Sequence, residues 1–220
     1  TGDNIHRIVW KIYAKSGQLV VRIPETKDPY ASHLYFYASF FNGLTMEDGA
    51  FETELLNVYK DHVRNLLEAL QRNGYEARLP QDQELARLSG VSEKKNDLFQ
   101  ITAASWQHQQ APALFVNPAK AAFICMPSLV PVREVEAMLR NLPDSIPVMV
   151  VKLSDAIPSP FNLSVKDIFF KNNSDPAVKL RQPWLLSSLR MELQRNEKEL
   201  AHLLKQRNNA WLTNNIEIQS

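Results

Sequence analysis

Apolar and polar residues alternate at the start of the chain, and this two-residue period predicts β-structure. In IHRIVWKIYAKSGQLVVRI, residues 5–23, the alternation on both sides of the link KSGQ predicts an antiparallel hairpin. Shorter apolar runs at 99–106 and 113–116 are expected to form further strands. The chain therefore opens with a hairpin that is expected to join a sheet.

A strand, a helix and a second strand are expected in order between residues 121 and 153. The runs at 121–126 and 147–153 are apolar with almost no polar alternation, and 130–142 carries apolar residues at helical spacing. A crossover of this length brings two strands together in parallel and is almost always right-handed. We therefore expect an α/β fold: a mixed sheet with an N-terminal hairpin and a late β-α-β unit, helices packed on it and a long C-terminal helix. An α+β arrangement is the alternative.

Six aromatic residues stand within twelve positions of DPYASHLYFYASFFNG, residues 28–43. The Asp-Pro start and the Asn-Gly end suit the two ends of a helix. Tyr30, Tyr37 and Phe41 share one face of this expected helix. That face is either buried on most sides or a surface for a partner, so these three residues enter the candidate contact surface.

A second helix is expected from Thr45 to the Asn-Gly pair at 73–74. One stripe of this segment is apolar and contains Phe51, Leu55, Tyr59, His62, Leu66 and Leu70. No second histidine follows His62 at helical spacing. We therefore interpret His62 as a core histidine and not as a metal ligand.

The segment RQPWLLSSLRMELQRNEKELAHLLKQRNNAWL, residues 181–212, is predicted to be one long helix. Its leucines recur at the spacing of a coiled-coil-like seam, although Asn196 stands in an apolar slot and Arg207 ends the series. The stripe either packs along its own domain or pairs with a second chain, and both alternatives stay open. The candidate partner-binding residues of this segment are Leu186, Leu189, Leu193, Leu200, Leu203 and Trp211.

Residues 81–98 contain a motif-like signal. The stretch ELARLSGVS resembles the first helix and turn of a helix-turn-helix. Leu88 falls one position early for that pattern, and polar Asn96 stands where the second helix needs an apolar anchor. The resemblance implies nucleic-acid binding as an alternative function. The residues that would contact nucleic acid are Arg87, Lys94 and Lys95.

Composition narrows the class of protein only slightly. The 220 residues are 45% hydrophobic and 22% charged, which is typical of globular proteins, and the net charge of +1 gives no overall field that attracts nucleic acid or an anionic membrane. The single cysteine, Cys125, excludes an intramolecular disulfide framework and favours a reducing compartment, so we expect a cytoplasmic protein. The apolar runs are too short for a membrane span.

Proline, asparagine and serine gather in residues 157–182 and predict an irregular connector. The expected organisation is an α/β core domain at 1–156, this connector, and a helical segment at 183–220. The chain starts at Thr1 without an initiator methionine, so we interpret it as an excised or processed piece.

Signatures of common chemistries are missing from the sequence. It contains no Gly-rich phosphate motif, no paired metal-ligand spacing and no serine elbow, so we expect no cofactor, no metal and no enzymatic activity. If there is a small-molecule pocket, it should lie at the carboxyl ends of the parallel strands, lined by Ser128, Ser154 and Asp155. These three residues are also ordinary turn and cap residues, which is the simpler interpretation.

The function that remains is a non-enzymatic interaction or assembly subunit of a larger complex. Its contact surfaces would be the C-terminal helix and the aromatic helix, and its partner would be another protein or a second copy of the chain. Two alternatives stay open: nucleic-acid binding through residues 81–98, and an enzyme or ligand sensor whose residues come together only in space.

Overall fold

The computed structural model describes residues 34–44, 49–72, 77–79, 82–157 and 183–213. The predicted N-terminal hairpin lies outside these residues, as does Tyr30 of the candidate contact surface.

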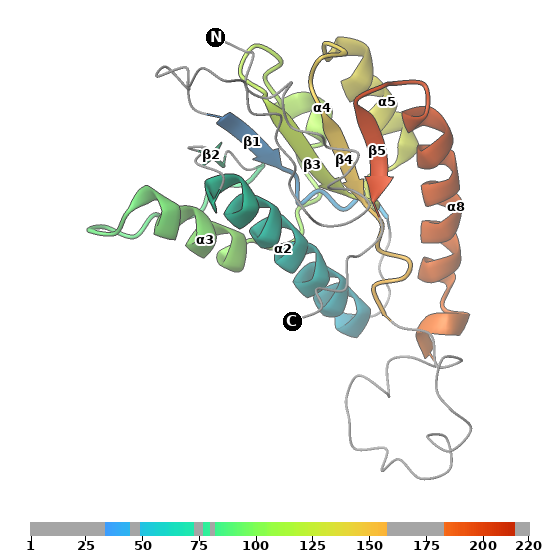
Figure 1. The fold of residues 1–220 in the computed structure, drawn as a ribbon. Coiled ribbons are helices and arrows are strands. Elements are labelled where there is room, and N and C mark those ends of the chain that lie inside the picture. Colours follow the sequence, from blue (N-terminus) through green and yellow to red (C-terminus); the bar gives the residue numbers. More distant parts are fainter. Residues whose placement is uncertain (1–33, 45–48, 73–76, 80–81, 158–182, 214–220) are drawn as a thin grey trace, which may run out of the picture.

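The described strands form one parallel sheet in the order β2-β1-β3-β4-β5 (Figure 1). This is one of the two common strand orders of doubly wound sheets, so the α/β class is confirmed. The strands are β1 Leu34–Ala38, β2 Ala77–Arg78, β3 Phe123–Pro127, β4 Val148–Val151 and β5 Ala210–Thr213.

Helices cover both faces of the sheet. In Figure 1, α2 and α3 lie on one side, and α4, α5 and α8 lie on the other. Successive residues of β3 and β4 point to opposite faces: Cys125 and Met149 join the core under α2, while Ile124 and Val148 join the core under α5. The helices are α2 Gly49–Arg72, α3 Glu93–Ala103, α4 Pro112–Phe115, α5 Val132–Asn141 and α8 Ser188–Leu204.

The predicted β-α-β unit and the predicted second helix are both confirmed. Strands β3 and β4 pair in parallel, with Ile124 opposite Val148, and α5 connects them. Both strands are buried along their whole length, as their unbroken apolar sequences require. Helix α2 buries every residue of the predicted apolar stripe, including His62.

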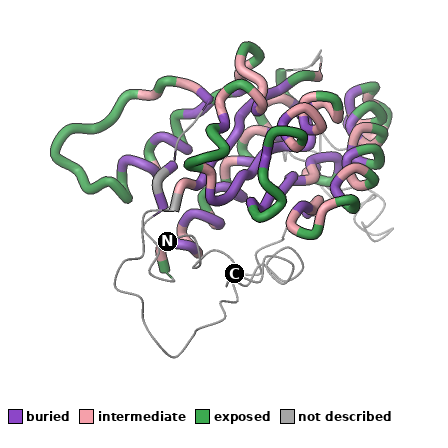
Figure 2. Tube along the Cα trace, turned by 90° about the horizontal axis from the view of Figure 1, so that it is seen from above, coloured by how far each residue is buried: buried purple, intermediate pink, exposed green. Residues whose placement is uncertain are grey.

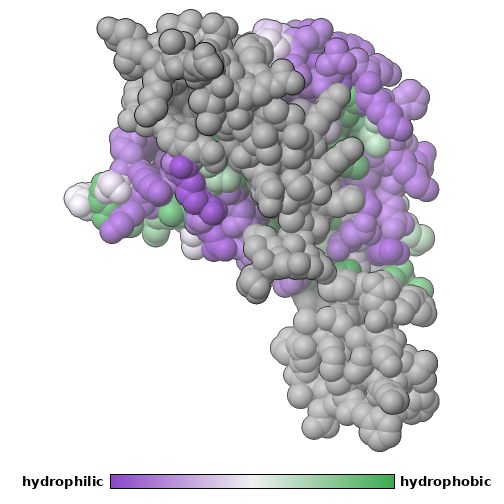
Figure 3. Space-filling view, in the orientation of Figure 1, coloured by the Kyte–Doolittle hydropathy of each residue, from purple (hydrophilic) through white to green (hydrophobic). Residues whose placement is uncertain are grey.

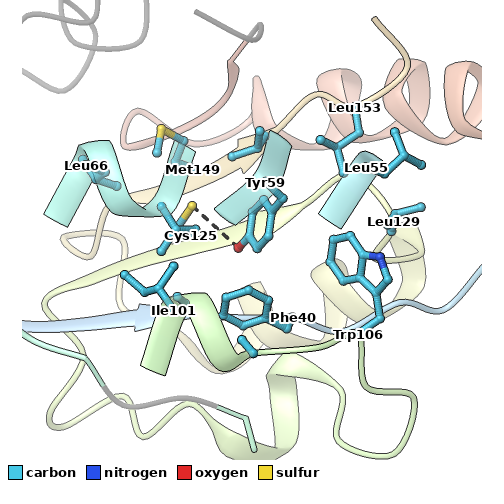
Figure 4. Close-up of a cluster of buried hydrophobic side chains, with 14 of the residues drawn as sticks. Phe40, Leu55, Tyr59, Leu66, Ile101, Trp106, Cys125, Leu129, Met149 and Leu153 are labelled. Atoms are coloured by element: carbon cyan, nitrogen blue, oxygen red, sulfur yellow. Dashed lines mark hydrogen bonds between the residues drawn. The ribbon is translucent and has the colours of Figure 1, made fainter. Parts of the chain in front are cut away.

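The core under α2 is rich in aromatic side chains (Figure 4). Tyr59 of α2 contacts two other rings. The ring centroids are 5.3 Å apart for Phe40, in an edge-on arrangement, and 5.7 Å apart for Trp106, in a stacked one. Such pairs stabilise a core by more than their buried area alone. The Trp106 indole also donates a hydrogen bond to the Glu52 carbonyl oxygen at 3.1 Å, so it ties the loop after α3 to the start of α2.

The aromatic helix predicted at 28–43 is wrong. Residues 34–38 of this segment form strand β1, which lies between β2 and β3. The aromatic residues are dense because β1 is covered on both faces: Phe36 belongs to the core under α2, and Tyr37 to the core under α5. Tyr37 and Phe41, expected as contact residues, are 5% and 8% exposed and pack inside the domain.

The single long helix predicted at 181–212 is also wrong. Ser187 interrupts it, because its hydroxyl accepts a hydrogen bond from the Arg190 amide at 3.1 Å and caps α8. Helix α8 ends at Leu204, and the chain then forms strand β5, which contains Trp211. The segment therefore completes the same parallel sheet beside β4.

The leucine stripe of α8 packs against its own domain. Leu189 and Leu193 join the core under α2, and Leu200 joins the core under α5. Leu203 is half-buried, while Leu186 precedes α8 and is 85% exposed. The partner-binding role predicted for the buried leucines is therefore replaced by packing in cis.

The helix-turn-helix interpretation fails at its first helix. Residues 84–88 contain no helix, and Ala86 in the middle of them is exposed. Asn96 is buried, and two hydrogen bonds to the backbone of Leu88 compensate for the loss of water. Its side-chain oxygen accepts from the Leu88 amide at 2.7 Å, and its side-chain nitrogen donates to the Leu88 carbonyl at 3.2 Å. These two bonds hold an irregular loop against α3, so the polar residue that broke the motif has a different structural role.

The strands predicted at 99–106 and 113–116 are wrong as well. Residues 99–103 are the second half of α3, and most of 113–116 belongs to the short helix α4. Both apolar runs were too short for their period to separate strand from helix.

Candidate functional site at the carboxyl edge of the sheet

The carboxyl ends of β1, β3 and β4 meet at one edge of the sheet because the strands are parallel. Polar residues follow each end: Ser39 after β1, Ser128 after β3, and Ser154 with Asp155 after β4. Ser39, Ser128 and Ser154 are buried. The edge that sequence analysis selected as a pocket mouth is thus lined with polar side chains.

Glu197 of α8 lies at the centre of the β3–β4 half of this edge. Its carboxylate accepts hydrogen bonds from the Ser128 hydroxyl at 2.8 Å and the Ser154 hydroxyl at 2.5 Å. The backbone amides of Leu153 and Ser154 also donate to it, at 3.0 and 2.9 Å. Glu197 is only 3% exposed, so four donors compensate the loss of water around a buried carboxylate.

Asn196, next to Glu197, binds the turn that leads into α5. Its amide nitrogen donates to the carbonyl oxygens of Ser128 at 2.8 Å and Val130 at 2.9 Å, and its amide oxygen accepts from the Val132 amide at 3.2 Å. This explains why a polar residue stands in the apolar seam: α8 crosses the edge of the sheet at this point, where backbone groups need partners.

The β3–β4 half of the edge is therefore a structural network. The Ser128 and Ser154 hydroxyls both donate to Glu197, and Asp155 pairs with Lys152. Sequence analysis predicted the serines as the lining of this edge but did not identify Glu197 as their partner. No local pattern could reveal that partner, because 69 residues separate Ser128 from Glu197.

Asp82 lies at the carboxyl end of β1. One oxygen of its carboxylate, Oδ2, accepts from the Ser39 hydroxyl at 3.0 Å, the Phe40 amide at 2.8 Å and the Gln107 side-chain amide at 2.7 Å. The other oxygen, Oδ1, is buried and makes no hydrogen bond. Burial raises the pKa of Asp82, and the hydrogen bonds from Gln107, Phe40 and Ser39 oppose that rise.

Asn42 and His108 extend this cluster. The Asn42 side-chain oxygen accepts from the Leu44 amide at 3.0 Å, whereas its Nδ2 is buried without a partner. His108 Nδ1 lies 2.7 Å from the Asn42 carbonyl oxygen. Because a carbonyl can only accept, Nδ1 carries the proton, and Nε2 of the neutral ring is left as an acceptor. His108 is exposed and belongs to the solvent side of the cluster.

A glycine holds this cluster close to the next strand. The Gly43 amide donates to the Leu129 carbonyl at 3.2 Å, and a Cβ at Gly43 would lie 2.5 Å from Pro131 Cδ. Any side chain there would push the end of β1 away from the loop after β3. The Asn-Gly pair, interpreted from sequence as a helix stop, in fact permits this close approach.

A second feature outside the sheet edge is the projection formed by residues 84–103, which comprises an irregular loop and α3. Figures 1 and 2 show it extending away from the sheet, with an exposed loop at its end. Leu88, Val91 and Phe99 are 43%, 38% and 37% exposed, whereas α3 buries three polar residues together with Ile101. Those buried polar residues are Asn96, Asp97 and Gln100.

The three basic residues predicted to bind nucleic acid also lie on this projection. Arg87, Lys94 and Lys95 are exposed, and Arg87 is 4.0 Å from Glu93. Figure 3 shows polar and apolar surface mixed at this end of the molecule. Without the first helix of the expected motif, these residues have no helix-turn-helix to present them.

Comparison with protein-family models, curated proteins and solved structures found no match. In the described part of the chain, no three metal-ligating side chains are grouped closely enough to hold a metal ion. None of the described helices is long and apolar enough to cross a membrane. The strand order and the helices on both faces define a doubly wound α/β domain.

Proposed function

We propose that this chain is a non-enzymatic interaction or assembly subunit of a larger complex, and that the projection at 84–103 is its contact surface. The leucines of α8 and the aromatic residues Tyr37 and Phe41 are used in the core, so a partner needs another surface. The partner is a protein, which includes a second copy of the chain. We propose a cytoplasmic location, which the single, buried and unpaired cysteine favours.

The observation that carries this proposal is the group of exposed apolar side chains on the projection. Helix α3 buries Ile101 together with Asn96 and Gln100 but leaves Phe99 facing solvent. Leu88 and Val91 of the preceding loop are also exposed. Apolar side chains held outward on a projecting element are typical of contact sites, where the core of an interface is apolar.

Charge at the projection favours a particular kind of protein surface. Lys94 and Lys95 are exposed on the same projection as the apolar residues. The Glu93 carboxylate lies 4.0 Å from the Arg87 guanidinium. A partner that contacts Leu88 and Phe99 and places carboxylates at its rim would complement this pattern. Rim charges of this kind mainly set association rate and orientation.

The test uses the full chain with Leu88 and Phe99 changed to serine. The matched control is Leu114→Ser, because Leu114 is 75% exposed but lies on α4, away from the projection. Quantitative co-purification from the native cell is compared for the wild type, the double variant and the control, together with light scattering of each purified protein. We expect the double variant to lose a partner, or self-association, that the control retains. An interaction profile that is identical for all three proteins would contradict the proposal.

A further inference from the structure

The end of β1 is the point where the chain changes direction across the sheet. Strand β1 lies between β2 and β3, and the helices that follow β1 and β3, α2 and α5, cover opposite faces. In doubly wound sheets, ligands bind outside the carboxyl ends of the strands at this position, because the two connections leave in opposite directions. The cluster of Asp82, Asn42, Gln107 and His108 lies here.

Two buried side-chain atoms of this cluster have no hydrogen-bond partner, and they differ in character. Asp82 Oδ1 is an acceptor, and Asn42 Nδ2 is a donor. Asp82 is 5% exposed and Asn42 is 1% exposed. Both residues adjoin Gln107, because the Asn42 amide donates to the Gln107 carbonyl at 2.9 Å and the Gln107 side chain donates to Asp82 at 2.7 Å.

Unpaired buried polar groups are unfavourable and rare, so each needs an explanation. The neighbours of Asp82 are already engaged: Ser39 and Phe40 donate to Oδ2, and none of them turns toward Oδ1. The Asn42 amide oxygen is engaged by Leu44, which fixes the direction of Nδ2. The surrounding chain thus holds a free acceptor and a free donor in place at the switch point of the sheet.

We propose that this cluster is a binding site for a neutral polyhydroxylated small molecule, that is, a sugar or another polyol. A hydroxyl group both donates and accepts, so hydroxyls of one ligand can donate to Asp82 Oδ1 and accept from Asn42 Nδ2. The carboxylate of Asp82 disfavours an anionic ligand. Among the described residues, no third His, Cys, Asp or Glu side chain joins Asp82 and His108 to hold a metal ion.

His108 supplies the solvent-facing part of this site. Its Nδ1 is held by the Asn42 carbonyl oxygen, so Nε2 can accept a further ligand hydroxyl. Asp82 Oδ1 and Asn42 Nδ2 are buried, whereas His108 is exposed. His108 thus adds an exposed acceptor to the buried donor and acceptor of Asn42 and Asp82. This inference does not depend on the interaction surface at 84–103.

Asp82→Asn is the decisive variant. An asparagine can keep one oxygen in the position of Oδ2, where it still accepts from Ser39, Phe40 and Gln107, while its NH2 replaces the free oxygen. The fold keeps its hydrogen bonds, but the acceptor offered to the ligand becomes a donor. The matched control is Glu84→Gln, which makes the same chemical change at an exposed carboxyl two residues away.

The measurement is the side-chain amide resonance of Asn42 during titration of the full chain with glycerol, ribose and glucose. Dioxane, which has ether oxygens but no hydroxyl, serves as the negative ligand. We expect a saturable shift with at least one polyol in the wild type and in Glu84→Gln, no saturable shift with dioxane, and at least a tenfold weaker response in Asp82→Asn. Absence of any saturable shift in the wild type, or an equal response in Asp82→Asn, would overturn the proposal. Circular dichroism of each variant shows whether it is folded.

Discussion

The hydroxyl of Tyr59 on α2 donates to Sγ of Cys125 on β3 at 3.8 Å, inside the core under α2 (Figure 4). Both side chains are fully buried, so the Cys125 thiol replaces water as the hydrogen-bond partner of the Tyr59 hydroxyl. Burial raises the pKa of Cys125 to about 12, although the bond from Tyr59 opposes that rise. The pair therefore belongs to the packing between helix and sheet and not to a reactive site.

We expect the Cys125 thiol to be unreactive in the folded protein. A thiol with so high a pKa carries almost no thiolate at neutral pH, and thiolate is the nucleophile. Reaction with a disulfide reagent should be at least about a hundredfold slower for the native chain than for the chain in denaturant, as absorbance at neutral pH would show. Fast stoichiometric labelling of the native protein would contradict the burial described for this residue.

Replacing Glu197 with alanine should destabilise the fold strongly. The change leaves the buried Ser128 and Ser154 hydroxyls and the Ser154 amide without this acceptor, while the Leu153 amide keeps its bond to Ser128 Oγ. We expect a loss of about 3 kcal/mol in the free energy of unfolding. Urea unfolding followed by fluorescence measures this loss. Glu199→Ala is the control, because Glu199 is exposed and its pair with Arg195 should contribute less than about 1 kcal/mol. Equal losses in the two variants would contradict the role assigned to Glu197.

The variant Asn196→Leu distinguishes two explanations of how α8 packs, because they predict opposite changes in stability. The leucine would complete the apolar seam, so a coiled-coil interpretation predicts higher stability. The structure predicts the opposite, because the Ser128 and Val130 carbonyls and the Val132 amide lose their partner. We expect a destabilisation of about 1–3 kcal/mol, measured by thermal or urea unfolding. A variant more stable than the wild type would contradict the docking of α8 described above.

Two leucines at the start of the C-terminal segment should respond differently to alanine. Leu193 is fully buried against the sheet and α2, so Leu193→Ala should lower the free energy of unfolding by about 2–5 kcal/mol. Leu186 is 85% exposed, and Leu186→Ala should change it by less than about 0.5 kcal/mol. The same urea experiment measures both variants. The reverse order would show that the segment does not pack in cis.

His62 should make stability depend on pH. Burial lowers its pKa to about 4 from an ordinary value of 6.5, so the unfolded chain binds a proton at pH values where the folded chain does not. Neutral His62 therefore makes its full contribution to the free energy of unfolding above pH 6.5. That contribution is lost as the pH falls toward 4, and the free energy of unfolding drops by roughly 3 kcal/mol in total.

The pH dependence is measured by urea unfolding at steps between pH 7 and pH 4. His62→Leu should remove most of the His62-linked loss, while His202→Gln should leave it unchanged because His202 is exposed. A wild-type slope that survives in His62→Leu would assign the effect to other groups.

The parts of the fold that sequence predicted are those with one unambiguous period. Helix α2 carries a single apolar stripe over 24 residues, and β3, α5 and β4 follow one another with clear changes of pattern. Strand β1 was missed because both of its faces are covered, and a run of aromatic residues without polar alternation fits a buried helix equally well.

The C-terminal segment shows a second kind of limit. Its apolar spacing predicts a helix, but Ser187 and the start of β5 at Ala210 interrupt the helix, and neither a proline nor a glycine marks those points. Propensity alone would continue the helix through both. Pairing with β4 decides that the last residues extend, and that pairing is tertiary.

The polar clusters at the sheet edge could not be predicted in full because their members are far apart in the chain. Ser39 and Asp82 are separated by 43 residues, and only the neighbouring ends of β1 and β2 bring them together. The rule for parallel strands predicts that Ser128 and Ser154 lie at one edge of the sheet, and the structure has both serines there. The carboxylates that bind those serines depend on which helix and loop cross the edge, and this is fixed only in the folded chain.

The place of β5 has a consequence for how the molecule is made. Strand β4 is buried on both faces and receives its outer neighbour only from residues 210–213. Until the ribosome has released those residues, β4 is an apolar edge strand whose backbone amides and carbonyls are unpaired. Such an edge favours incorrect pairing with other nascent chains. Translation that stalls between 157 and 188 should therefore yield a species that depends on chaperones, whereas release of β5 pairs the exposed edge of β4.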